Sequence, residues 1–204
     1  MKNTPVEING KQYWVSRSMA VVAYVYAYIG GELCILANKR GPGLPTNVGK
    51  WNAPSGYLDY DERLEEGAGR EVWEETGLKI NPTDLRLEEL DRTPTRRGGQ
   101  NVIVRYSMLR YNTDGTIVSS LTTEHSEPNE VDEIKWVPLK HIHEYEWTSE
   151  KHKKCILDYA DQYNVLFSLK KITSKLIGPS IVPVTPTPYH AEPILFDENA
   201  PVSE

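Results

Sequence analysis

Three glutamates close together in the sequence, Glu71, Glu74 and Glu75, have the residue type and spacing to do chemistry. The segment from about Leu64 to Thr76 predicts a helix, on which about 100° per residue places these carboxylates within an arc of about 100°. Like charges at such spacings destabilise a helix by about 0.2–0.5 kcal/mol per pair, and the C-terminal half of a helix disfavours anions. A bound cation removes both costs, and carboxylate oxygens are the ligands that Mg²⁺ takes. The alternative is a solvated acidic face.

The spacing of the surrounding residues decides between these alternatives. The segment from Gly56 to Leu78 fits the pattern G-x5-E-x7-R-E-U-x-E-E-x-G-U, where U is a bulky aliphatic residue. The fitting positions are Gly56, Glu62, Arg70, Glu71, Val72, Glu74, Glu75, Gly77 and Leu78. At average residue frequencies, a chance match has odds below about one in a million. This pattern is the Nudix box, and the sequence resembles the Nudix hydrolases.

Two flanking segments add to the resemblance. Trp51 to Gly56, here called the lead-in segment, is similar to the W-x-x-P-x-G sequence that precedes the box in this family. Glu133 to Leu139 is similar to the family's closing strand and turn. The resemblance implies an α/β protein with the Nudix fold, an α/β/α sandwich with a mixed β-sheet. It also implies hydrolysis of a pyrophosphate bond in a nucleoside diphosphate linked to another moiety.

The resemblance further implies a metal site. Glu71 and Glu75 are expected to be the principal ligands, and Glu74 a further ligand or a residue that supports them. The backbone near Gly56 is expected to contribute a carbonyl oxygen. The expected cofactor is Mg²⁺, with Mn²⁺ as the alternative. Metal ions neutralise the pyrophosphate oxygens that repel a nucleophile, orient the substrate and acidify a bound water.

Two other catalytic roles follow from the resemblance. Glu62 is expected to pair with Arg70, which in turn holds a metal-ligand carboxylate in place. A carboxylate must also accept the proton of the attacking water, and in the family this base lies either in the box or in a downstream loop. Glu130 leads the loop candidates, with Glu127 and Asp132 behind it, because they immediately precede the predicted closing strand.

Residues of the predicted loops are candidates for binding the substrate. Arg40 follows a predicted strand and can meet a phosphate, although a basic residue there is more often solvated. Trp51 can wall a pocket, and it is at least as well explained as a core residue. Arg96 and Arg97 lie in a glycine-containing loop over residues 92–100.

The substrate class is indicated only by a small feature. Some family members with ADP-ribose activity carry a proline at the position of Pro94, sixteen residues after Leu78. This favours ADP-ribose or a nucleotide sugar as the small-molecule partner. The alternative function is a Nudix-fold sensor or regulator that binds a nucleotide metabolite without turnover. Such proteins usually lose box carboxylates, and this sequence keeps them all.

The rest of the sequence predicts the elements that must hold this site. Met19–Ile29 predicts a strand, and Asn9-Gly10 predicts the type I′ turn of a hairpin between Val6–Ile8 and Lys11–Val15. Further strands are predicted at Leu33–Lys39, Leu78–Ile80, Leu85–Asp91 and Asn101–Tyr111, the last with Thr116–Leu121 as its partner. Helices are predicted at Lys140–Tyr145, from Thr148 or Ser149 to Tyr163, and over Val165–Leu176.

The composition divides the chain into two parts. Residues 1–177 are expected to form the Nudix hydrolase domain, and residues 178–204 a proline-rich, extended C-terminal tail. Two apolar clusters in this tail, at 181–184 and 194–196, are more hydrophobic than a free linker needs. They favour an arm laid on the domain or on the second subunit of a homodimer.

Charge and hydropathy limit the classes of partner. The net charge of −6 argues against a nucleic-acid or membrane partner. No signal-peptide pattern opens the sequence, and the longest apolar run, Met19 to Ile29, is too short to cross a bilayer. Two cysteines far apart, Cys34 and Cys155, favour reduced thiols in the cytoplasm over a disulfide.

Overall fold

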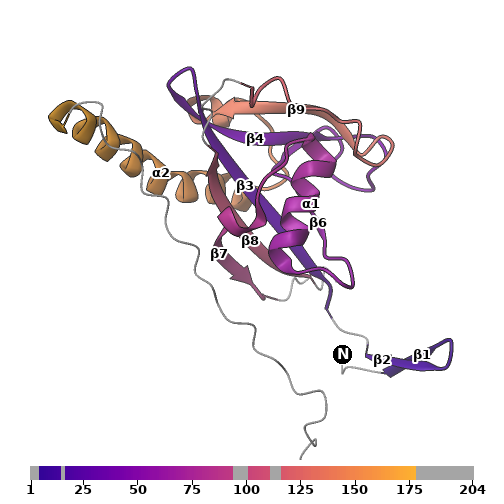
Figure 1. Ribbon diagram of the computed structural model, residues 1–204. Coiled ribbons are helices and arrows are strands. Elements are labelled where there is room, and N and C mark those ends of the chain that lie inside the picture. Colours follow the sequence, from indigo (N-terminus) through magenta and orange to yellow (C-terminus); the bar gives the residue numbers. More distant parts are fainter. Residues whose placement is uncertain (1–4, 15–16, 94–100, 111–115, 178–204) are drawn as a thin grey trace, which may run out of the picture.

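A mixed sheet of seven strands lies at the centre of the computed structural model, which describes residues 5–14, 17–93, 101–110 and 116–177 (Figure 1). Neighbouring strands follow the order β5 (Trp51–Asn52), β4 (Glu32–Arg40), β3 (Met19–Ile29), β8 (Val102–Arg110) and β7 (Arg86–Asp91). In addition, β6 (Ser55–Tyr57) pairs with β3, and β9 (Val131–Pro138) pairs with β4. The sheet is mixed because β3 runs parallel to β8 and antiparallel to β4.

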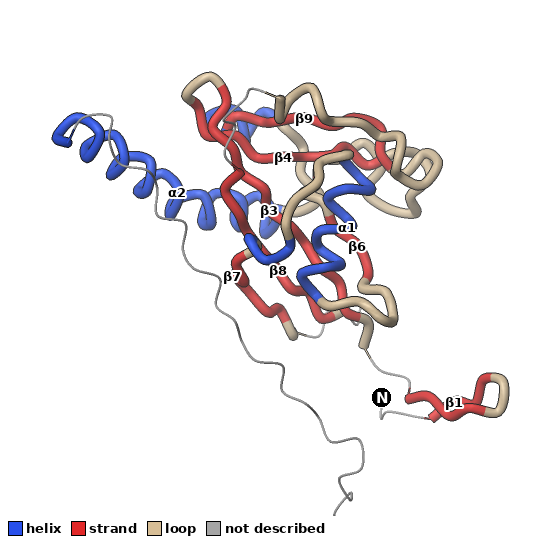
Figure 2. The backbone as a smooth tube through the Cα atoms, viewed as in Figure 1, coloured by secondary structure: helices blue, strands red, loops and turns tan. Residues whose placement is uncertain are grey.

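Helices pack on both faces of this sheet (Figure 2). On one face, α1 (Leu64–Thr76) contributes Val72 to a buried cluster with residues of β3 and β8. On the other face, the 3-10 helix η2 (Leu139–Glu144) and the N-terminal half of α2 (Glu150–Ile177) pack against β3 and β4, with Ile156 at the centre. The predicted α/β/α sandwich with a mixed sheet is confirmed.

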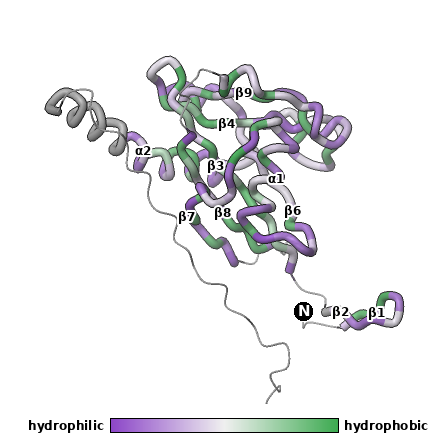
Figure 3. Tube along the Cα trace, in the orientation of Figure 1, coloured by the Kyte–Doolittle hydropathy of each residue, from purple (hydrophilic) through white to green (hydrophobic). Residues whose placement is uncertain are grey.

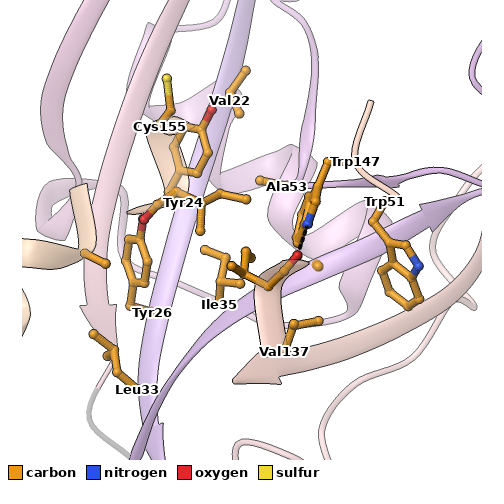
Figure 4. Close-up of a cluster of buried hydrophobic side chains, with 14 of the residues drawn as sticks. Val22, Tyr24, Tyr26, Leu33, Ile35, Trp51, Ala53, Val137, Trp147 and Cys155 are labelled. Carbon is orange, nitrogen blue, oxygen red and sulfur yellow. Dashed lines mark hydrogen bonds between the residues drawn. The ribbon is translucent and has the colours of Figure 1, made fainter. Parts of the chain in front are cut away.

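Strand β3 supplies both buried clusters, because successive side chains of a strand point to opposite faces. Val21 and Val25 pack under α1, whereas Tyr24 and Tyr26 pack on the α2 side. Figure 3 shows hydrophobic residues concentrated along β3 and β8, and Figure 4 shows the cluster on the α2 side. Strand β3, which the continuous apolar run predicted, therefore lies in the middle of the protein and is buried on both faces.

Helix α1 has the bounds that the sequence predicts, and its ends are fixed locally. At its start, the backbone N–H of Arg63 donates to Glu66 Oε2 over 3.0 Å. At its end, Gly77 takes a left-handed conformation with φ 74° and closes the helix, as glycine does at this position. A Cβ at the interior glycine Gly67 would lie 2.7 Å from Glu62 Oε2, so an alanine there would require the Glu62 side chain to shift.

Two predicted strands are wrong. Leu78–Ile80 is irregular and leads into the 3-10 helix η1 (Pro82–Asp84). Residues 116–120 form turns, although their β-branched composition suggested a partner for β8. Because β8 is already paired with β3 and β7, no edge of it is left for a third strand. The segment instead buries Ile117, whose carbonyl accepts a hydrogen bond from Trp136 Nε1.

The N-terminal hairpin is confirmed and forms its own two-stranded sheet. β1 (Pro5–Ile8) pairs antiparallel with β2 (Lys11–Trp14). Asn9 and Gly10 both have positive φ, 54° and 78°, as a type I′ turn requires.

Helix α2 joins two helices that the sequence predicts separately, and Ser149 caps its start by accepting from the N–H of His152 over 3.1 Å. Among the described residues, no helix is long and apolar enough to cross a membrane. Cys34 and Cys155 are buried free thiols, as expected. Residues 178–204 lie outside the described part of the chain, so the domain boundary and the tail stay predictions.

Candidate active site

Helix α1 turns two of its glutamates into the protein rather than toward solvent. Glu71 and Glu75, one helical turn apart, are only 8 % and 3 % exposed, on the same side of the helix as the core residue Val72. Glu74 is half-buried. The alternative of a solvated acidic face does not hold for Glu71 and Glu75, because solvated glutamates remain exposed and these two are buried.

The lead-in segment and the start of β6 meet these two glutamates from the opposite side. The backbone N–H of Ser55 donates to Glu75 Oε2 over 3.0 Å. Gly56 lies against the other glutamate, and a Cβ at this position would clash with the Glu71 carboxylate. A side chain at position 56 would therefore force the Glu71 carboxylate or the backbone to shift, which agrees with the glycine that the pattern has here.

Arg70 donates hydrogen bonds to four groups, one of which is the buried Glu71. Its Nε donates to Glu62 Oε1 over 2.7 Å, and its Nη1 donates over 2.8 Å to both Glu71 Oε1 and Glu74 Oε2. Its Nη2 donates to the carbonyl of Tyr57. The guanidinium holds the pKa of Glu62 below its usual range, against the opposing effect of burial. The structure thus has both contacts that the resemblance predicts for Arg70.

The electrostatics of the site favour a bound cation. Burial raises the pKa of Glu71 to about 7, with Arg70 opposing the shift and the charges of Glu74 and Glu130 adding to it. Burial also raises the pKa of Glu75, and Glu71 and Glu130 add to that shift. The negative charges of these carboxylates repel one another, and a divalent cation would relieve that repulsion.

Glu130 reaches this group from the loop before β9. Two glycines bring that loop close: the N–H of Gly41 donates to the carbonyl of Glu130 over 2.6 Å, and that of Gly43 donates to Asn129. A Cβ at Gly41 would clash with the Asn129 carbonyl, so the two loops pack backbone against backbone. The charge of Glu130 acts on both Glu71 and Glu75.

The other two base candidates are placed differently. Asp132 is half-exposed and pairs with Lys39 at 2.7 Å, and Glu127 is exposed. Of the three loop candidates, Glu130 is the one whose charge is among the main causes that raise the pKa values of Glu71 and Glu75.

The donor set fits a hard divalent ion, although its geometry is not yet that of a metal complex. Within the described ranges, no group of three or more His, Cys, Asp or Glu side chains is already arranged to hold a metal. Arg70 engages one oxygen of Glu71 and one of Glu74. Glu71, Glu74, Glu75 and the backbone at Gly56 offer only oxygen donors, which is the donor type that hard divalent cations take.

The substrate-binding candidates have different outcomes. Arg40 lies close enough for its charge to oppose the raised pKa of Glu75, and its Nε donates to the carbonyl of Thr46. Trp51 is 7 % exposed and lies in the core on the α2 side, as the core alternative expects, and its role as a pocket wall stays a prediction. Arg96 and Arg97 lie outside the described residues.

Two buried polar residues near the site were missed by the sequence reasoning. Asn38 on β4 is 2 % exposed, and its Oδ1 has no hydrogen-bond partner. A polar residue at an inward position of an apolar strand was the available signal. His152 accepts a hydrogen bond from the backbone of Ala53, 99 residues earlier. No local pattern could have revealed that contact.

Comparison with known proteins identifies one type of domain in this chain. The NUDIX domain family model matches residues 17–159. Phosphatase NudJ of Escherichia coli (strain K12) is 45 % identical over 51 residues, which are 23 % of this chain and 33 % of that protein. The chain therefore spans about a third of the length of the curated relatives it matches.

Solved structures resemble a larger part of the chain. The NUDIX domain of Shewanella oneidensis NrtR complexed with ADP ribose has a TM-score of 0.56 at 21 % identity, covering 73 % of this chain and 90 % of that one. NrtR complexed with a 27mer DNA has a TM-score of 0.53 at 22 % identity, covering 71 % and 61 %. The MutT protein from Methanosarcina mazei Go1 has a TM-score of 0.50 at 27 % identity, covering 73 % and 96 %.

Proposed function

The chain belongs to the NUDIX domain family, and from this premise we propose that it hydrolyses a pyrophosphate bond in a nucleoside diphosphate linked to another moiety. One observation carries the proposal. Two buried glutamates, Glu71 and Glu75, are held against the backbone at Ser55 and Gly56, and the charge of a third carboxylate, Glu130, helps to raise the pKa of both. Burying this much like charge is costly unless a cation or a proton compensates it.

The residues that would hold the metal ion are Glu71, Glu75 and the backbone at Gly56, with Glu74 as a further ligand. When bound, Mg²⁺ or Mn²⁺ would neutralise the pyrophosphate oxygens and acidify a water. Arg70 supports this set by fixing Oε1 of Glu71 and Oε2 of Glu74, which leaves the second oxygen of each directed elsewhere. The ion pair with Glu62 fixes Arg70 in turn.

Glu130 is the proposed general base. The attacking water forms a bond to phosphorus, the bridging P–O bond breaks, and the Glu130 carboxylate accepts the proton of the water. Its loop is anchored by the Gly41 N–H, which suits a group that must lie at a fixed distance from Glu71 and Glu75. Replacing Glu130 with Gln should lower kcat by about a hundredfold while Mn²⁺ still binds.

The proposed substrate is ADP-ribose or a nucleotide sugar. Pro94 in the sequence supports this choice, and the likeness to a domain solved with ADP ribose is compatible with it. Arg40, whose charge acts on Glu75, is the proposed contact to a phosphate of the substrate. The proposed compartment is the cytoplasm, in line with two buried free cysteines.

A panel of nucleoside diphosphate derivatives tests the function. Each compound is incubated with the protein and Mg²⁺, with an EDTA arm as the control, and the products are identified. Metal-dependent release of AMP and ribose 5-phosphate from ADP-ribose is the expected result. Turnover of nucleoside triphosphates or dinucleoside polyphosphates alone would overturn the substrate choice and leave the reaction class standing.

The second candidate is a sensor or regulator that binds a nucleotide metabolite without turnover. The likeness to NrtR, which has been solved with DNA, is the observation that favours it. The intact set of box carboxylates weighs against it, because a binding module has no need to bury Glu71 and Glu75. Saturable binding of ADP-ribose with no product under any metal would favour this alternative, and a DNA-binding assay would then test the expectation that nucleic acid is not a partner.

A further inference from the structure

The lead-in segment is held in place mainly by residues that lie outside the box. Its far end carries Ser55, whose N–H holds the Glu75 carboxylate. One residue earlier, the carbonyl of Pro54 accepts from the N–H of Ala23 on β3. The direction in which Ser55 presents its N–H therefore depends on what holds the residues before Pro54.

The connection between η2 and α2 holds the first two residues of this segment. The N–H of Trp51 donates to the carbonyl of Glu146 over 2.8 Å, and the N–H of Thr148 donates to the carbonyl of Trp51 over 3.0 Å. The hydroxyl of Thr148 donates to Asn52 Oδ1 over 3.2 Å. A segment from the C-terminal third of the chain thus pairs with the short strand β5.

His152, in the first turn of α2, holds the third residue. Its Nε2 accepts a hydrogen bond of 2.9 Å from the N–H of Ala53, which is fully buried. Because Nε2 accepts, it carries no proton, and the proton lies on Nδ1, which faces the hydroxyl of Tyr24 at 3.4 Å. The imidazole also stacks at 6.0 Å on Trp147, so its plane is fixed. Ala53, Tyr24 and Trp147 belong to one buried cluster (Figure 4).

We propose that His152 is a positioning residue for the metal-binding carboxylates, acting through Ala53 on Ser55 and so on Glu75. This inference rests on the proposed function. The link between the two hydrogen bonds is short and stiff, because the proline ring at position 54 fixes its own φ and restricts Ala53 to an extended conformation. Without the imidazole, the Ala53 N–H is left buried with no acceptor, and the segment must shift to find one.

Two variants that differ by one methylene test the role. In His152→Gln the Oε1 oxygen reaches the former position of Nε2 and can still accept from Ala53, whereas in His152→Asn the amide ends near the former position of Nδ1 and cannot. Mn²⁺ binding is measured directly from the free-ion signal by electron paramagnetic resonance, alongside kcat and the Mg²⁺ concentration for half-maximal rate. His152→Asn is expected to weaken Mn²⁺ binding about tenfold, at the lower end for residues that orient ligands, and His152→Gln to retain it.

A second buried residue of α2 supplies the control. Tyr163 is 7 % exposed in the same cluster and bonds to Ser107 on β8, away from the lead-in segment. Tyr163→Phe should lower the melting temperature and leave Mn²⁺ affinity unchanged. Equal Mn²⁺ affinity in His152→Asn and the wild type would overturn the positioning role, as would equal weakening in the Asn and Gln variants. If the wild type itself binds no Mn²⁺, the proposed function fails instead.

Discussion

The two faces of the central sheet bury charged groups in opposite ways. Under α1, Glu71 and Glu75 are buried with carboxylates as their neighbours, and their pKa values are raised. Under α2, the buried Arg105 lies between Glu89 and Asp91, at 3.1 and 3.5 Å. Lys151 of α2 pairs with the same two acids, and the pKa of Asp91 is lowered to about 2.

The difference separates a face on which buried charges of opposite sign are paired from a face on which buried carboxylates are in excess. Opposite charges across the β7, β8 and α2 contact satisfy each other within the protein. The carboxylates around Glu75 have Arg70 and Arg40 as counter-charges, and these leave a surplus of negative charge. Buried carboxylates with raised pKa values and too few counter-charges are candidates for a functional site, and we expect a bound cation to stabilise this face. Four predictions test this contrast.

The largest effect is expected at Glu75. Glu75→Gln keeps the shape and the acceptor for the Ser55 N–H but removes a charge from the centre of the carboxylate group. We expect kcat to fall about a hundredfold or more, with a melting temperature in EDTA equal to or above that of the wild type. Glu65→Gln is the matched control, since Glu65 lies on the same helix and its Oε1 only accepts from the Tyr106 hydroxyl. Wild-type activity in Glu75→Gln would contradict the metal-site assignment.

The second prediction concerns Arg70, the positively charged side chain that bridges three carboxylates on the α1 face. Arg70→Ala leaves Glu62, Glu71 and Glu74 without their shared donor. We expect activity to fall about tenfold or more and the free energy of unfolding to drop by about 1–3 kcal/mol. Arg63→Ala, an exposed arginine at the start of the same helix, should change neither. Thermal melting and initial rates at saturating Mg²⁺ measure both effects, and an Arg70→Ala protein indistinguishable from Arg63→Ala would remove the bridging role.

The same contrast explains how far the sequence alone could go. Apolar periodicity and Gly77 predict the bounds of α1, and the same periodicity places the three glutamates beside the apolar stripe, because these features depend on spacing within one helix. The strand at Thr116–Leu121 was wrong because its composition was right for a strand while β8 had no free edge. The contact of His152 with Ala53 joins residues 99 positions apart, and periodicity carries no information about such pairs.

The third prediction uses pH to separate the two faces. Burial raises the pKa of Glu71 from 4.5 to about 7, so the folded protein keeps a proton that the unfolded chain has released. The stability from this group is full below about pH 4.5 and is lost as pH rises towards about 7. In EDTA, the wild type should lose melting temperature relative to Glu71→Gln over that interval. Mg²⁺ should restore the wild type at about pH 8 and leave the variant unchanged. A constant difference between the two proteins across the interval would contradict the shift.

The smallest effect is expected on the α2 face, at Asp91. Its hydrogen bond from Lys151, 2.5 Å long, is the main cause of a pKa lowered from 3.8 to about 2, and burial opposes that shift. The folded state therefore binds fewer protons than the unfolded chain, so this stability is present above about pH 4 and is lost as pH falls towards about 2. Asp91→Asn should lower the melting temperature near neutral pH by about 2–4 °C, as for loss of about 1 kcal/mol in a domain of this size.

That difference should shrink as the pH falls, because the wild-type Asp91 becomes protonated and then resembles asparagine. Neither kcat nor Mn²⁺ affinity should change in Asp91→Asn, since its partners Lys151 and Arg105 lie on the face away from Glu75. Melting curves from about pH 2 to about pH 7, with a Mn²⁺ titration at the neutral end, measure both quantities. If Asp91→Asn instead weakened Mn²⁺ binding, the Asp91–Lys151 ion pair would act on the metal site in addition to His152, and this charge cluster would not be independent of Glu75.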